Sequence, residues 1–306
     1  MTATAAGTGT GTGQRGDGIG YYGRPVLHDP VWKKEVPLYL FTGGLAGASS
    51  VLAAGGRLTG RPGLARAARR AAFGGTLVSP ALLITDLGRP SRFANMLRVV
   101  RPTSPMNMGA WLLSLYAPAA GAAAALDALG ALPRVGGVAD ASAGVLGSLL
   151  TTYTGVLLAD TAVPAWHEAG RDLPFVFAGS AAASAGAAAA ILAPPPEAGP
   201  ARRLALAGFA AEQAALRRLE GRLDPVVAAA YRDGPAARYL KAARWLGVAG
   251  GVTLALAGER RRRAVAGGAL LLASAVATRF AIFKAGFQSA GDPAATIVPQ
   301  RARVRS

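Results

Sequence analysis

Residues 36–54 read VPLYLFTGGLAGASSVLAA, an uncharged run in a chain of 306 residues. As a helix, a run of this length nearly crosses a bilayer core of about 30 Å. Similar runs recur along the chain, which is 52% hydrophobic and 16% charged, with a mean hydropathy of +0.32. Soluble domains carry about 25% charged residues. The sequence therefore predicts an all-α integral membrane protein.

The uncharged runs predict a bundle of about eight transmembrane helices. They are 36–54, 71–85, 106–126, 141–159, 173–193, 204–216, 245–258 and 264–278, the last continuing to Phe283. The sixth span is the weakest, because it contains Glu212 and Gln213. We expect the bundle to occupy residues 31–290, between a disordered Gly/Thr-rich tail over 1–30 and a basic tail over 291–306.

The formal net charge of +17 raises the question of a nucleic-acid partner. The Lys and Arg residues lie between the apolar runs, however, where basic residues ordinarily set membrane topology. No nucleic-acid partner is expected, and membrane lipids are the surroundings that the sequence predicts.

Cysteine is absent and histidine occurs twice, as His28 and His167. Iron–sulfur clusters need cysteine thiolates, and neither histidine lies within a predicted span. We therefore expect no haem, no iron–sulfur cluster and no metal held by this chain.

Eight spans put both termini and the loops after spans 2, 4 and 6 on one side of the membrane, here called side A. Most chemically distinctive segments fall there. They are 28–39, 85–111, 157–174 and the end of the last span with Arg279. The loops of the opposite side, side B, are plain basic tethers such as 55–70 and 259–263. Function is predicted on side A.

Gly43 and Gly47 are spaced as a small-xxx-small pair, which lets two helix backbones approach closely. The pair can serve a homodimer or packing within the bundle, and the second interpretation is favoured.

Three segments resemble the NrfD/PsrC family, the membrane subunits of polysulfide, nitrite and formate-type molybdopterin oxidoreductases. They are VWKKEVPLYLFTGGLAGASSVLAA (31–54), LLITDLGRPSRFANMLRVVRPTSPMNMGAW (82–111) and YTGVLLADTAVPAWHEAGRDLPFVFAGSAAASAGA (153–187). The resemblance covers residues 21 to about 290 and is most specific in the first five spans.

The resemblance implies a multi-pass subunit of the plasma membrane that exchanges electrons with menaquinone, bound as a substrate. A ferredoxin-like partner with several [4Fe–4S] clusters would dock on one face, and a molybdopterin subunit would carry the catalytic chemistry. A purely structural anchor and a proton-translocating or transport subunit remain as alternatives.

A quinone site needs an apolar slot with a few polar groups for the carbonyl oxygens and two protons. The candidates on side A are Glu35, Tyr39, Asp86, Arg89 and Tyr153. Tyr153 matches the quinone-site tyrosine of the family, whereas Tyr39 stands where the polysulfide reductase pattern has a histidine. Asp86 with Arg89 can instead be a structural ion pair.

Aromatic residues at the ends of spans have a common alternative role, because the membrane interface collects them in belts. This interpretation applies to Tyr39, Trp32, Trp111 and Trp166.

The loop over 87–105 is predicted to dock the iron–sulfur partner. The candidate contacts are Arg92, Arg98 and Arg101, joined by His167 from the loop after span 4. Arginine forks suit carboxylates and carbonyls of a partner, although a topogenic role is the alternative. Glu212 is a candidate for a proton path, because an ionisable group within a span is a functional candidate by default.

Overall fold

A computed structural model describes residues 27, 30, 32–87 and 89–305, so the predicted tail over 1–30 falls almost entirely outside it. The described chain contains α-helices and one 3₁₀ turn, and no strand occurs within these ranges. Eight helices have at least 20 residues. They are α1 (Glu35–Leu58), α2 (Pro62–Leu87), α4 (Pro105–Leu129), α5 (Pro133–Ala159), α7 (Leu173–Leu192), α8 (Gly199–Arg222), α10 (Gly234–Ala255) and α11 (Arg261–Ala290). They match the eight predicted spans in order.

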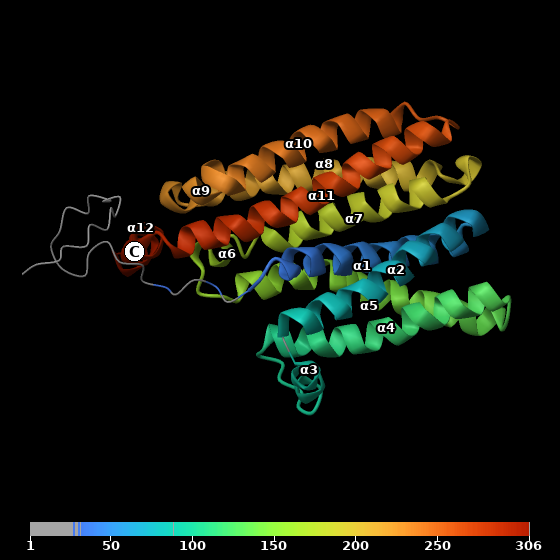
Figure 1. Ribbon diagram of the computed structural model, residues 1–306, viewed down its shortest axis with the longest axis horizontal. Coiled ribbons are helices and arrows are strands. Elements are labelled where there is room, and N and C mark those ends of the chain that lie inside the picture. The colour runs from blue at the N-terminus through green and yellow to red at the C-terminus, as the bar shows by residue number, and fades with distance from the viewer. Residues whose placement is uncertain (1–26, 28–29, 31, 88, 306) are drawn as a thin grey trace, which may run out of the picture.

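Five of these helices, α1, α4, α5, α7 and α11, are long and apolar enough to cross a membrane. The other three have 26, 24 and 22 residues and carry more charge, yet they run beside the five in one bundle (Figure 1). At 1.5 Å per residue, each of the eight reaches about 30 Å or more. The chain is a multi-pass, all-α membrane protein.

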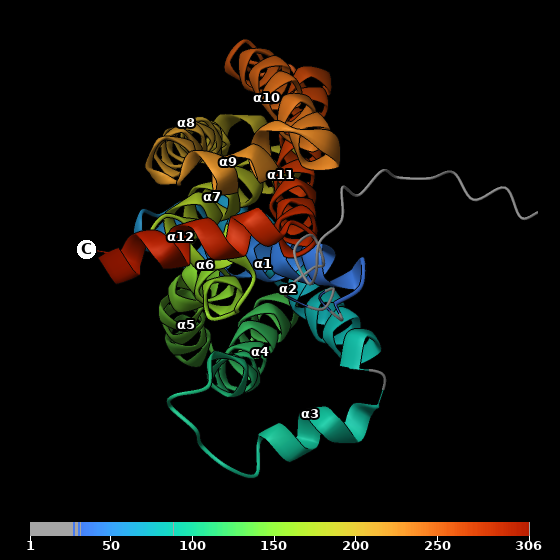
Figure 2. The same cartoon turned by 90° about the vertical axis from the view of Figure 1, so that its left-hand side faces the viewer.

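The long helices form two groups of four. Helices α1, α2, α4 and α5 pack together as a first half-bundle, and α7, α8, α10 and α11 pack as a second. Helices α1 and α7 lie in the middle and join the halves, with α1 also contacting α11 (Figures 1 and 2). Because α1 contacts both halves, its position fixes much of the bundle.

Four shorter helices lie at one end of the bundle, on the left of Figure 1. They are α3 (Pro90–Met96), α6 (Pro164–His167), α9 (Pro225–Arg232) and α12 (Pro293–Arg305). This end is side A, so the predicted division of the loops between two sides is confirmed. The 3₁₀ turn η1 (Pro195–Glu197) lies between α7 and α8 on side B. Most of the predicted basic C-terminal tail is helix α12, which lies across the helix ends in Figure 2.

Proline positions explain where many helices begin. Its fixed φ suits the first helical position, where an N–H would have no partner inside the helix. Proline is the first residue of α2, α3, α4, α5, α6, α9 and α12. In the predicted docking loop, Pro90 begins α3 and Pro105 begins α4, so the loop holds one short helix and no long excursion. The Ser104 hydroxyl caps α4 by accepting from the N–H of Asn107.

The backbones of α1 and α5 meet at Gly47 and Gly147. A Cβ atom added at Gly47 would lie 2.4 Å from the carbonyl oxygen of Gly147, and one added at Gly147 would lie 2.5 Å from that of Gly47. Only glycine fits at such a distance on either helix. The favoured interpretation of Gly47, packing within the bundle, is confirmed.

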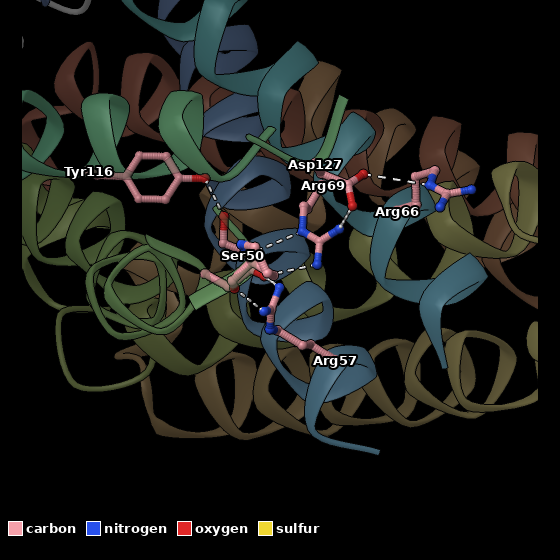
Figure 3. Close-up of polar contacts among 8 residues, drawn as sticks. Ser50, Arg57, Arg66, Arg69, Tyr116 and Asp127 are labelled. Atoms are coloured by element: carbon pink, nitrogen blue, oxygen red, sulfur yellow. Dashed lines mark hydrogen bonds and ion pairs between the residues drawn. The ribbon is translucent and has the colours of Figure 1, made fainter. Parts of the chain in front are cut away.

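A buried ion network ties the first half-bundle together near side B (Figure 3). The Arg69 guanidinium donates to both carboxylate oxygens of Asp140, at 2.7 and 2.9 Å, and to Asp127 at 2.6 Å. Arg57 donates to Asp140 and to the carbonyl of Pro133, and Arg66 lies 3.6 Å from Asp127. Only 2% of Asp140 is exposed, so this is a paired charge inside the protein. The prediction of a plain basic tether was therefore wrong for residues 55–70.

Deeper in the same half-bundle, hydroxyl groups from three helices meet. The Ser50 hydroxyl of α1 lies 2.9 Å from the Tyr116 hydroxyl of α4 (Figure 3). The Tyr116 hydroxyl also accepts from Thr76 of α2 at 3.5 Å. Buried hydroxyls need such partners, because an unpaired polar group inside a membrane protein is costly.

We expect Gly47→Ala to destabilise the protein by about 1–3 kcal/mol, the usual range for overpacking. The control Gly55→Ala lies on the same helix, where an added Cβ meets no atom within 4 Å. It should be neutral or slightly stabilising, because alanine is the better helix former. Thermal unfolding of the purified protein in detergent measures both. Equal midpoints for the two variants would contradict the close contact.

Candidate functional site

A cavity opens at the side-A end of the first half-bundle. Its walls come from α1, α2, α4 and α5, and α3 contributes Met96. The polar groups on its surface are Tyr39, Asp86 and Tyr153, and the other lining residues are apolar. The structure therefore brings together three of the five predicted quinone-site residues from three different helices.

The two tyrosines reach the cavity from neighbouring helices. Tyr39 of α1 is only 4% exposed, so the alternative of a belt aromatic is wrong for this residue. The Tyr153 ring of α5 lies against Gly109 of α4, where an added Cβ would approach the phenol carbon and oxygen to 1.9 Å. Gly109 thus makes room for the ring. Among the described residues, neither hydroxyl has a hydrogen-bond partner, so both are available to a ligand.

Asp86 lies near the end of α2 and lines the cavity. Its Oδ1 accepts a hydrogen bond of 3.3 Å from the backbone N–H of Lys33, just before α1. Within the described chain it forms no ion pair with Arg89, which is exposed. The alternative of a structural Asp86–Arg89 pair is therefore wrong, and Arg89 lies outside the cavity lining.

Glu35 lies one helical turn before Tyr39 on α1 but does not line the cavity. Its Oε2 is buried without a hydrogen-bond partner in the described part of the chain. Its predicted role toward a quinone stays a prediction.

Two methionines and one tryptophan form part of the cavity lining. Met96 and Met106 line it, together with Trp32. The Trp32 ring stacks on Trp166 with centroids 5.3 Å apart. The enclosed volume is about 40 Å³, room for one or two water molecules. A larger ligand enters only when some of these side chains turn outward.

Trp166 is buried, with 1% of its surface exposed, so the prediction of an interfacial role was wrong for it. Its indole N–H donates to the carbonyl of Ile282 at 2.7 Å, and its ring lies against Gly286. It anchors α6 to α11. Trp111 is half-buried and donates to the carbonyl of Val99 at 3.4 Å, so it helps to hold the docking loop.

Asn107 fixes the loop between α3 and α4. Its side-chain amide donates to the carbonyls of Met96 and Val99, at 2.5 and 2.9 Å, and its oxygen accepts from the N–H of Arg101 at 2.7 Å. One side chain thus satisfies three backbone groups that would otherwise lack partners. Because Met96 lines the cavity, this clamp also fixes one cavity wall.

The predicted docking residues lie on side A. Arg92, Arg98 and Arg101 are exposed on α3 and the following loop. An open cavity of about 480 Å³ lies on this loop, between Arg92 and Asn107. His167 is exposed at the end of α6, with Nδ1 3.2 Å from the carbonyl of Ala159. Contact of these residues with a partner stays a prediction.

The second half-bundle holds a buried acid and a buried base. Glu212 of α8 and Arg279 of α11 are each 1% exposed, and both carboxylate oxygens of Glu212 lack a hydrogen-bond partner among the described residues. Arg279 donates to the carbonyl of Phe177 at 3.2 Å, and its guanidinium carbon lies 3.6 Å from the centre of that ring. It also reaches Gly44 of α1, at the joint between the half-bundles.

Arg279 was expected at the side-A end of the last span. It lies instead well inside α11, which continues to Ala290, so that expectation was wrong. Glu212 is buried near the middle of α8, and its part in a proton path stays a prediction. The sequence signal for Arg279 was available, since a single arginine interrupts a long apolar run.

The sequence model of a family described as polysulphide reductase, NrfD, matches residues 26–199. A search of curated proteins finds no match. The matched range covers α1 to α7 and therefore all the helices that line the side-A cavity. Because the match spans more than half of the chain, this protein belongs to the NrfD family of polysulphide reductase membrane proteins.

Proposed function

We propose that this chain is the quinone-reactive membrane subunit of a molybdopterin and iron–sulfur oxidoreductase complex. It would bind menaquinone in the side-A cavity and pass electrons between the quinone and the [4Fe–4S] clusters of a docked partner. The catalytic chemistry would belong to a third, molybdopterin-containing subunit. The complex would lie in the plasma membrane. Membership of the NrfD family supports this class of function.

One observation carries the proposal: two tyrosine hydroxyls without partners among the described residues face one apolar cavity beside a carboxylate. A quinone head group has two carbonyl oxygens that accept hydrogen bonds, and its interconversion with the quinol moves two electrons and two protons. Tyr39 and Tyr153 can donate to the carbonyl oxygens. Asp86 lies between the cavity and the side-A surface, where a carboxylate can exchange protons with water.

The cavity must open for this ligand. Met96 and Met106 line it, and methionine side chains are unbranched and rearrange easily. Their outward rotation would enlarge the cavity while the tyrosines stay in place, since the Tyr153 ring is packed on Gly109. The polar residues of the lining therefore fit the chemistry of a quinone head group, and the two methionines are the lining residues that can move to admit it.

The docking loop supports the same arrangement. Met96 lines both the side-A cavity and the open cavity beside Arg92 and Arg101. A partner bound to this loop would therefore lie directly against the wall of the quinone cavity. A short path between the two redox groups is what electron transfer through a chain without its own metal centres requires.

Tyr153→Phe should lower quinone-linked turnover about 2- to 10-fold, because it deletes one hydrogen bond worth about 0.5–1.5 kcal/mol. The purified complex, assayed with a menaquinone analogue, measures the change. Tyr239→Phe is the control, since Tyr239 is exposed on α10 and stacks on Phe280 in the second half-bundle. Unchanged turnover in an intact Tyr153→Phe complex would favour the purely structural anchor.

Arg98→Gln with Arg101→Gln should release the iron–sulfur subunit from the membrane fraction, and more so at high salt, because exposed charge pairs are screened. Co-purification at rising salt measures the release. The control pair Arg217→Gln with Arg238→Gln makes the same charge change near side A in the second half-bundle, where both residues are exposed. If both pairs release the partner equally, the docking surface is not specific to the loop.

A proton-translocating function is the second candidate, favoured by the buried Glu212 and Arg279. Ionisable groups at membrane depth commonly mark proton paths. If Glu212 carries protons, Glu212→Gln should abolish quinone-driven acidification or alkalinisation in proteoliposomes while uncoupled turnover persists. A pH-sensitive dye reports the first quantity and quinol absorbance the second. Equal proton movement in both proteins would leave Glu212 a structural role.

A further inference from the structure

The side-B end of the first half-bundle has a groove between α2 and α4 that the quinone proposal does not use. Its volume is about 540 Å³, and Arg66, Arg69 and Arg70 line it from α2. We call it the lipid-facing groove. The groove adjoins the buried ion network of Figure 3, because Arg66, Arg69 and Asp127 belong to the network and also line the groove.

The arginines of the groove are not all needed by the network. Arg69 is engaged by Asp140 and Asp127. Arg66 is 3.6 Å from Asp127 but keeps 55% of its side chain exposed. Arg70 is exposed and makes no ion pair or hydrogen bond among the described residues. The groove and the network together hold four arginines and two aspartates, which leaves two positive charges in surplus.

The wall of the groove that α2 forms changes from charged to apolar side chains along one face of the helix. Arg66, Arg70, Phe73 and Leu77 follow each other at spacings of four, three and four, so they share a helical face. Phe73 is 39% exposed and Leu77 is 59% exposed. This order, basic near the helix end and apolar farther into the bundle, matches a molecule with an anionic head and a hydrocarbon tail.

The opposite wall is made of small residues of α4. Gly121, Ala124, Ala125 and Ala128 line the groove there. A Cβ atom added at Gly121 would meet no atom within 4 Å, so the space beside this residue is open. A hydrocarbon chain could pack against these small residues without displacing any side chain of the bundle.

We propose that this groove is a binding site for one anionic phospholipid. Arg66 and Arg70 hold the phosphate by charge-assisted hydrogen bonds, and the upper part of an acyl chain lies along Phe73 and Gly121. Basic pockets between transmembrane helices recognise anionic head groups in this way. The site is separate from the side-A cavity and does not depend on quinone binding.

The test is native mass spectrometry of the full-length protein, titrated in detergent with phosphatidylglycerol or phosphatidylcholine. We expect one phosphatidylglycerol to bind more tightly than phosphatidylcholine. Arg66→Gln with Arg70→Gln should weaken phosphatidylglycerol binding about 30-fold, from two basic contacts of the usual size at an anionic lipid. Both residues are exposed, so the bundle should fold as before.

Two matched variants distinguish binding in the groove from a general attraction of anionic lipid to a positively charged protein. Arg134→Gln with Arg203→Gln removes the same charge from exposed residues near side B and should leave the binding unchanged. Gly121→Leu keeps every arginine but fills the groove and should also lower phosphatidylglycerol binding. Equal binding of the two lipids, or equal weakening by both arginine pairs, would overturn the proposal. Undiminished binding to Gly121→Leu would overturn it as well.

Discussion

The close contact between Gly47 of α1 and Gly147 of α5 is the constraint on which the rest of the structure depends. Lipid is as apolar as a helix surface, so membrane helices associate through tight packing and polar contacts. Tyr39 lies two turns from Gly47 on α1, and Tyr153 lies less than two turns from Gly147 on α5. A wider separation of the two backbones would therefore move the two tyrosines apart and open the side-A cavity between them.

A second constraint joins the cavity to the surface above it. Asn107 holds the backbone of Met96 and Val99, so the loop that would receive a partner and the wall that would admit a quinone share one anchor. The backbone N–H of the same residue donates to the hydroxyl of Ser104, which caps α4. A partner on the loop would therefore lie beside the backbone that carries the Met96 side chain of the cavity wall.

The sequence predicted what depends on local composition. Long uncharged runs predicted the eight long helices, and the number of runs predicted the two sides. The polar residues chosen at the side-A ends of these runs include three that line the cavity. The prediction failed where a charge pairs with a distant helix. Arg70 comes directly before the uncharged run 71–85, and Asp140 directly before the run 141–159. Because the spans were drawn to begin after these charges, Arg69 and Asp140 were assigned to loops, although they pair inside the bundle. Arg279 ended the run at 278 in the same way and was placed at the surface. Asn107 was missed because its partners are backbone groups, which leave no pattern in the sequence.

The pairing of Arg69 with Asp140 also sets a condition on biosynthesis. The two residues are 71 positions apart, so at roughly 5–20 residues per second the arginine exists for about 4–14 s before its aspartate is made. During that time only Asp127, made 58 positions after Arg69, can pair with the guanidinium, and a guanidinium without its full set of partners is costly inside the hydrocarbon layer. We expect α2 to wait with Arg69 among the lipid head groups, and to move inward only when α5 arrives. The last step in building the first half-bundle would then be the burial of a charge.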